Sequence, residues 1–232
     1  MSQHRRVIAI LALLSFSPPA ALARAQAGDA QVTFAANIEK CKAHLAVSAE
    51  AYASGDRAGS LHASHPIQEI GNKVIGPASK VSADLGDTVR ATLRQPSAKL
   101  KGAPTPAEYD QVVREAAATL DEVSARVVPK ERRTSLSFRA RVLADLLLGI
   151  ATEYEEAYHA GKITQPVEYQ DAYAFLRRAQ AVHRDLAPSL RAKNPALARE
   201  VDGLSTVTQF SPGVVIENSP PPPLRWWWPR PA

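Results

Sequence analysis

Apolar residues recur at helical spacing through most of this chain, and that periodicity is the strongest constraint on its fold. The first such stretch places Phe34, Ile38, Cys41, Leu45 and Tyr52 on one stripe. Further stretches with the same spacing cover residues 67–89, 105–127, 130–158 and 165–190, and none shows sustained strand-like alternation. Because short connections favour antiparallel neighbours, we predict an all-α fold, an antiparallel helical bundle of about five helices.

Local signals set the expected helix ends. Thr105-Pro106-Ala107-Glu108 supplies an N-cap, a first-turn proline and a capping-box glutamate in order. Gly76-Pro77 predicts a kink or break in the second helix. We expect the fourth helix to start after Pro129 and to stop at Gly161, and a shorter helix to run from residue 195 to about residue 209.

The two ends of the chain differ in composition from its body. Residues 1–25 combine a basic start, an apolar run at 7–14 and small residues at 21–25, which predicts a cleavable signal peptide and a periplasmic location. No later apolar run has the roughly 20 residues of a spanning helix, so we expect no transmembrane segment in the mature chain. Residues 26–210 form the predicted bundle. Residues 211–232 form a Pro/Trp-rich tail that we expect to be disordered, with Trp226-Trp227-Trp228 near its end.

Charge and motifs exclude several function classes. The formal charge is +5, but five of the 28 basic residues lie in the predicted signal peptide and the last 14 residues, which leaves 23 against 23 acidic residues. A near-neutral body removes the electrostatic case for binding nucleic acid. The chain also lacks a nucleophile elbow, a zincin motif, a phosphate-binding loop and a dinucleotide fingerprint. We therefore expect no enzymatic activity.

The segment His62-Ala63-Ser64-His65-Pro66-Ile67-Gln68-Glu69 is the one most like a metal site. Two histidines three apart, with a glutamate four further on, could converge on one ion, and imidazole with carboxylate suits zinc, copper or iron. Pro66 disfavours a helical backbone at His65, so we expect no continuous helix through all three, and His65 could instead cap a helix that starts at Pro66.

Other polar residues have ordinary structural explanations. His183 lies on an apolar stripe, as a core histidine would, and His159 falls in the last turn of a predicted helix, where a cation suits the helix dipole. Cys41 is the single cysteine and lies mid-stripe, which favours a buried thiol. Carboxylates at 153, 156, 168 and 171 could approach one another across a hairpin near Gly161-Lys162, or they could form a solvated acidic face.

Two blocks of sequence resemble a known family. The first runs from His44-Leu45 through Tyr52, Gly55 and His62 to Glu69, and the second from Glu153-Tyr154 through Gly161-Lys162-Ile163 to Phe175. Together they resemble the helical extracytoplasmic, N-terminal domain of bacterial high-affinity iron permeases, which also occurs free-standing, over about residues 40–190. The resemblance implies an accessory role in handling iron or a similar cation. The residues carried over by position are His44, His62, His65, Glu69, Glu168 and Asp171.

Two hypotheses follow from these patterns. In the first, an exported helical protein binds a transition-metal ion, iron before copper or zinc, through those six residues and serves a membrane permease or another envelope protein. It requires the helix from Phe34 and the segment at His62 to pack against the helix beginning at Gln165. The alternative is a metal-free envelope interaction module that acts through its surfaces and its C-terminal tail.

Overall fold

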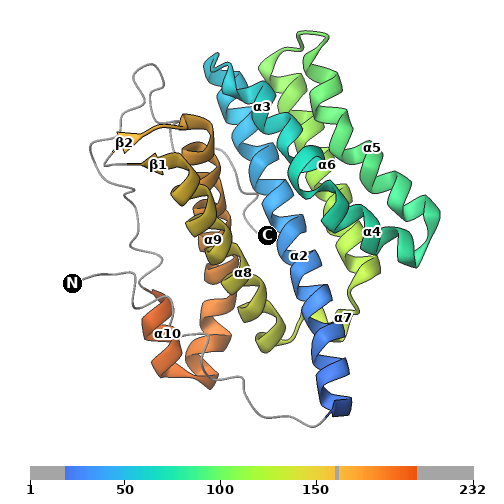
Figure 1. The fold of residues 1–232 in the computed structure, drawn as a ribbon, viewed down its shortest axis with the longest axis vertical. Coiled ribbons are helices and arrows are strands. Elements are labelled where there is room, and N and C mark those ends of the chain that lie inside the picture. The colour runs from blue at the N-terminus through green and yellow to red at the C-terminus, as the bar shows by residue number, and fades with distance from the viewer. Residues whose placement is uncertain (1–18, 160–161, 203–232) are drawn as a thin grey trace.

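A computed structural model describes residues 19–159 and 162–202 of the chain. Figure 1 shows a bundle of helices that run along the long axis of the molecule. The first half contains α2 (Pro19–Ser54), α3 (Ala58–His65), a π-helical turn η2 (Pro66–Ile70), α4 (Gly71–Val81), α5 (Ala83–Leu100) and α6 (Pro106–Val127). The second half contains α7 (Lys130–Arg133), α8 (Leu136–Ala157), β1 (Tyr158–His159), β2 (Lys162–Ile163), α9 (Pro166–Lys193) and α10 (Pro195–Asp202). The predicted all-α bundle is confirmed.

The long helix α2 lies in the middle of the bundle. It packs against α8 and α9 on one side and against α3, α4 and α6 on the other. The predicted apolar stripe of α2 is the reason, because Phe34, Ile38, Cys41 and Leu45 are all fully buried. Leu120 of α6 and Phe175 of α9 are equally buried, and burying apolar side chains of this size supplies most of the driving force for packing.

Several predicted helix boundaries are correct. The Thr105 hydroxyl accepts a hydrogen bond from the Glu108 amide while the Glu108 carboxylate accepts one from the Thr105 amide, so the capping box forms as expected. Ser135 caps α8 in a similar way by accepting from the Phe138 amide. The helix predicted from Gln165-Pro166 is α9, with Pro166 in its first turn.

Two boundaries are wrong. Of the kink or break predicted at Gly76-Pro77, the break does not occur, because Pro77 lies inside α4; the chain instead turns at Ser82, whose extended backbone lets its side chain cap α5. The fourth helix starts at Leu136, after the short α7, and ends at Ala157 rather than at Gly161. Tyr158 and His159 then pair with Lys162 and Ile163 in a two-stranded hairpin. His159 is therefore an exposed strand residue, and the prediction that it lies in the last turn of a helix is wrong.

The predicted ends are covered only in part. The predicted signal-peptide cleavage sites near Ala23 and Ala25 fall within α2, and residues 1–18 lie outside the described part of the chain. The helix expected at 195–209 is described as α10 as far as Asp202. The predicted tail, residues 211–232, lies outside the described residues. Across the described ranges, no helix has the length and apolar character needed to cross a membrane.

Candidate metal centre

Three histidines and one aspartate meet in the interior where α2, α3 and α9 pack together. His44 comes from α2, His62 and His65 come from α3, and Asp171 comes from α9. His44, His62 and Asp171 are fully buried, and His65 is 7% exposed. One donor atom from each residue lies within 4.8 Å of the others. The packing that the metal hypothesis required is therefore present in the structure.

Asp171 is the centre of this cluster. Its Oδ1 accepts a hydrogen bond from His44 Nδ1 at 2.7 Å, and its Oδ2 accepts one from His65 Nδ1 at 2.8 Å. His62 Nδ1 lies 2.9 Å from Asp171 Oδ1, but the two atoms lack the alignment of a hydrogen bond. Burial by itself would raise the pKa of Asp171, yet the hydrogen bonds from His44 and His65, the charge of His44 and the close approach of His62 hold that pKa far below its usual range. Asp171 is thus a buried anion.

The backbone at His65 differs from the prediction. His65 is helical, with φ −53° and ψ −44°, and its side chain forms no cap, so both expectations drawn from Pro66 are wrong. The path from α3 to α4 stays helical because a π-helical turn over Pro66–Ile70 replaces an ordinary turn there. A wider turn accommodates a proline ring that would otherwise press on the carbonyl four residues earlier. His62 and His65 consequently lie on one helix face, with ring centroids 5.6 Å apart.

Two buried nitrogen atoms of the cluster have no hydrogen-bond partner among the described residues. They are His44 Nε2 and His62 Nδ1. The nearest carboxylate oxygen recorded for His44 Nε2 is Oε2 of Glu69, at 3.9 Å. An unpaired polar atom in the interior costs roughly 1–3 kcal/mol, so a water molecule or a bound ligand at these atoms would stabilise the arrangement.

Glu69 lies at the rim of the cluster rather than inside it. Its side chain is 43% exposed, and Oε1 is 3.6 Å from His65 Nδ1. Burial raises the pKa of Glu69, while the charges of His65 and His44 act in the opposite direction. Burial lowers and the hydrogen bond to Asp171 raises the pKa of His65, and the net shift is upward. Glu69 could therefore complete a coordination sphere from the solvent side.

Glu168 joins a second group of acids instead. Donor oxygens of Glu153, Glu156 and Glu168 lie within 4.8 Å of one another, at the end of α8 and the start of α9. The predicted approach of carboxylates across the hairpin is correct for these three, whereas Asp171 points into the histidine cluster. Burial, followed by repulsion from Asp171, Glu168 and other acids, raises the pKa of Glu153 to about 8. The charge of the histidine–aspartate cluster therefore acts on the acidic group of Glu153, Glu156 and Glu168.

Two residues that contact the cluster had no signal in the metal-ligand reasoning. Gln170 Oε1 is 2.7 Å from His62 Nε2, and the Phe175 ring packs edge-on against His44 with centroids 4.9 Å apart. Both lie in the second sequence block, on the same helix as Asp171, and the spacing of four residues between Asp171 and Phe175 was the available clue. The predictions for two further residues agree with the structure: Cys41 is a buried thiol, and His183 is a buried core histidine whose Nε2 lies 3.4 Å from Asp202 Oδ1.

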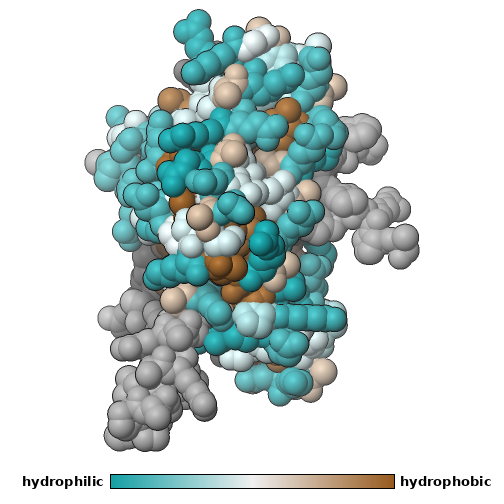
Figure 2. Space-filling model, turned by 90° about the vertical axis from the view of Figure 1, so that its right-hand side faces the viewer, coloured by the Kyte–Doolittle hydropathy of each residue, from teal (hydrophilic) through white to brown (hydrophobic). Residues whose placement is uncertain are grey.

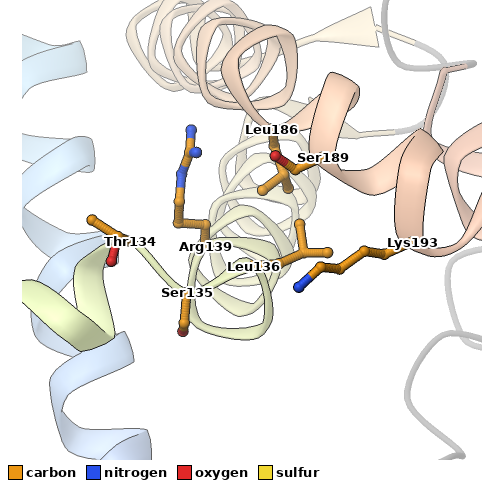
Figure 3. Close-up of a pocket in the computed structure, with 7 residues that line it drawn as sticks. All are labelled: Thr134, Ser135, Leu136, Arg139, Leu186, Ser189 and Lys193. Carbon is orange, nitrogen blue, oxygen red and sulfur yellow. The ribbon is translucent and has the colours of Figure 1, made fainter.

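A pocket at the opposite end of α9 has a different character. Figure 3 shows it between the start of α8 and the end of α9, with the side chains of Arg139 and Lys193 at its edges. Its lining is Thr134, Ser135, Leu136, Arg139, Leu186, Ser189 and Lys193. None of these side chains is an imidazole, thiol or carboxylate, so this pocket is no candidate for a cation.

Comparison with protein families supports the resemblance noted above. The model of the iron permease-associated 4-helix bundle domain matches residues 129–210. That part of the chain is therefore similar to the iron permease-associated helical domain. The matched part spans α7 to α10 and contains Asp171, Gln170 and the acids at 153, 156 and 168, whereas the three histidines lie before it. No curated protein and no solved structure matches the chain.

Proposed function

We propose that this protein binds a transition-metal ion, iron in the first place, outside the cytoplasm and acts as an accessory to iron uptake. The ion would lie among His44, His62, His65 and Asp171, with Glu69 at the solvent side. One observation carries the proposal: a buried anion is surrounded by three buried imidazoles, two of which have a buried nitrogen with no partner among the residues that the structure describes.

The spacing of the donors suits one ion. Metal–ligand bonds of about 2.0–2.2 Å allow two ligands to be at most about 4.4 Å apart. The four donor atoms lie within 4.8 Å of one another, so the cluster is compact enough for the side chains to close around one ion. Imidazole and carboxylate ligands suit iron, zinc and copper alike, and the relation to the iron permease helical domain favours iron.

The proposed role is binding for delivery or sensing, with no catalytic step. An exported accessory would pass its ion to a membrane permease or another envelope protein. Support for the location is the predicted signal peptide at 1–25, and support for the partner is the family relation. The iron is then cargo of the protein rather than a permanent cofactor.

Calorimetric titration of the purified, metal-stripped chain tests the proposal. Ferrous iron is titrated anaerobically, followed by copper and zinc, into the wild-type chain and the variant His62→Ala/His65→Ala. His159→Ala is the matched control, because His159 is exposed on β1 and outside the cluster. We expect micromolar or tighter binding that the control retains and the double variant loses. Equal binding by all three proteins, or no binding by the wild type, would refute the proposal.

The double histidine variant, together with a deletion of the tail, distinguishes the metal-binding proposal from the alternative of a metal-free interaction module. If function depended on the tail, deletion of residues 219–232 would abolish iron-dependent growth of the host while His62→Ala/His65→Ala would preserve it. We expect the reverse.

Figure 2 shows one face of the molecule, on which hydrophilic residues predominate and hydrophobic ones form small separate groups.

A further inference from the structure

Asp56 anchors the side chain of Gln170 in one orientation. Asp56 lies between α2 and α3; its Oδ1 accepts from the Ala58 amide at 2.9 Å and its Oδ2 accepts from Gln170 Nε2 at 3.0 Å. A carboxylate has no proton to donate, so only the NH₂ end of the Gln170 amide can face it. The carbonyl oxygen of Gln170 must then point the other way, toward α3.

That orientation determines which nitrogen of His62 carries the proton. Gln170 Oε1 is 2.7 Å from His62 Nε2, and a carbonyl oxygen can only accept a hydrogen bond. His62 Nε2 is therefore the protonated nitrogen. The other nitrogen, Nδ1, is buried 2.9 Å from Asp171 Oδ1, but the two atoms lack the alignment of a hydrogen bond, so Nδ1 donates no proton to Asp171.

His62 thus has the opposite tautomer to its two neighbours. His44 and His65 each donate an Nδ1 proton to Asp171. Without the acceptor at Gln170, His62 could do the same, because its Nδ1 is already close to Asp171 Oδ1. His62 Nδ1 would then carry the proton of a third hydrogen bond to Asp171, and it would have no free lone pair with which to bind an ion.

We propose that Asp56 and Gln170 are positioning residues that hold His62 in the Nε2–H tautomer, which makes Nδ1 its metal-binding atom. This inference rests on the proposed function. Ligating histidines in proteins generally donate their other ring N–H to a partner that fixes ring and tautomer, and loss of such partners typically weakens metal affinity about 10- to 100-fold. Asp56 acts here without touching the ion, through one amide.

The tautomer can be measured without any metal. Long-range ¹H–¹⁵N correlation spectra of the metal-stripped, full-length chain at pH 7.5 report which ring nitrogen of each histidine is protonated. We expect an Nε2–H signature for His62 and Nδ1–H signatures for His44 and His65. An Nδ1–H or doubly protonated His62 in the wild-type chain would overturn the proposal.

Two substitutions test the path from Asp56 through Gln170 to His62, which we call the relay: one changes Gln170, which contacts His62, and the other changes Asp56, which does not. Gln170→Met removes the acceptor and should turn His62 to the Nδ1–H form. Asp56→Asn should have the same effect on His62, acting through Gln170. The side-chain oxygen of the new asparagine must still accept from the Ala58 amide, so its NH₂ group faces Gln170 and forces the Gln170 amide to rotate by about 180°. Gln111→Met, an exposed position on α6, is the matched control and should leave all histidine signals unchanged.

Iron titration of the same proteins completes the test. We expect Gln170→Met and Asp56→Asn to bind ferrous iron about 10- to 100-fold more weakly than the wild type. Gln170→Glu keeps an acceptor for His62 Nε2–H and should retain the wild-type tautomer, although two carboxylates then face each other. Unchanged tautomers in both relay variants would overturn the proposal, as would unchanged iron affinity after a tautomer switch. If the wild-type chain binds no iron, the proposed function fails and Nδ1 has no metal role, while the spectra still decide whether the relay sets the tautomer.

Discussion

Replacing Asp171 by asparagine should destabilise the metal-free protein by about 3 kcal/mol at neutral pH. The wild-type carboxylate is fully buried and accepts hydrogen bonds at 2.7 Å and 2.8 Å from His44 and His65. A hydrogen bond to a charged group contributes about 1.5–3 kcal/mol, and breaking a buried charged network by removing one partner costs about 3–5 kcal/mol. The asparagine oxygen still accepts one bond, which places the expected cost at the lower end.

The cost should depend on pH in a defined direction. The pKa of Asp171 is depressed in the folded protein, so its contribution is present above the unfolded pKa of about 3.9 and is lost as the pH falls further. The pKa of His65 is raised, so its contribution is present below the unfolded pKa of about 6.5 and is lost as the pH rises through the folded value. The Asp171→Asn penalty should therefore be greatest between about pH 4 and pH 6.5.

Urea denaturation followed by circular dichroism, with metal removed, measures this penalty from the shift in midpoint at constant slope. In thermal melts the same change should lower Tm by about 6–12 °C, since 1 kcal/mol corresponds to about 2–4 °C for a domain of this size. Asp185→Asn, an exposed position on the same helix, should cost less than about 0.5 kcal/mol. If Asp171→Asn cost no more than that control, the histidine–aspartate network would not be the one described.

Three further changes test other parts of the structure by the same denaturation assay. Glu153→Gln should stabilise the protein by about 1 kcal/mol at pH 8 and by almost nothing at pH 4. The folded pKa of Glu153 is about 8, so the wild type loses stability as the pH rises above the pKa of the unfolded chain, and solvent screens part of the effect. A larger gain at acid pH would contradict this explanation. Thr105→Ala should cost about 1 kcal/mol by removing the capping box of α6, and an unchanged midpoint would mean that the cap contributes nothing. Glu39→Gln should cost about 3 kcal/mol at pH 7, because it removes the carboxylate that forms an ion pair with the largely buried Arg178 guanidinium. The cost should shrink below about pH 4, because the folded pKa of Glu39 is lowered; an equal cost at pH 3 and pH 7 would exclude the ion pair as its source.

The residues of the site come from two parts of the chain, one inside and one outside the segment that matches the iron permease-associated domain. Asp171 and Gln170 belong to the segment that matches the iron permease-associated domain, whereas all three histidines belong to α2 and α3, before that segment. The match therefore covers the buried Asp171 carboxylate and its neighbour Gln170, whereas the preceding helices supply the histidines. A truncation that began at residue 129 would retain the family match and lose every imidazole of the cluster.

The sequence by itself determined the helices and many of their ends. Helical hydrogen bonds join residues four apart, so the apolar stripe from Phe34 to Tyr52 and the capping box at Thr105 and Glu108 are local signals that need no knowledge of the fold. Local rules failed where a compensating structure was available nearby. Pro66 did not end a helix because a π-helical turn accommodated it, and the break expected at Pro77 occurred at Ser82, where a cap could form.

Only the tertiary structure decided which candidate residues form one site. Asp171 is 127 residues from His44 and 106 from His65 along the chain, and no local spacing could pair them. Packing of α2 and α3 against α9 made Asp171 the common partner, left Glu69 at the rim and sent Glu168 to the acids of α8. The protonation of His62 depends on a contact from Gln170 and, through it, on Asp56, 114 residues earlier in the chain than that amide. Such long-range contacts follow from how whole helices bury their apolar faces, which is why the residue types could be named from the sequence and their geometry could not.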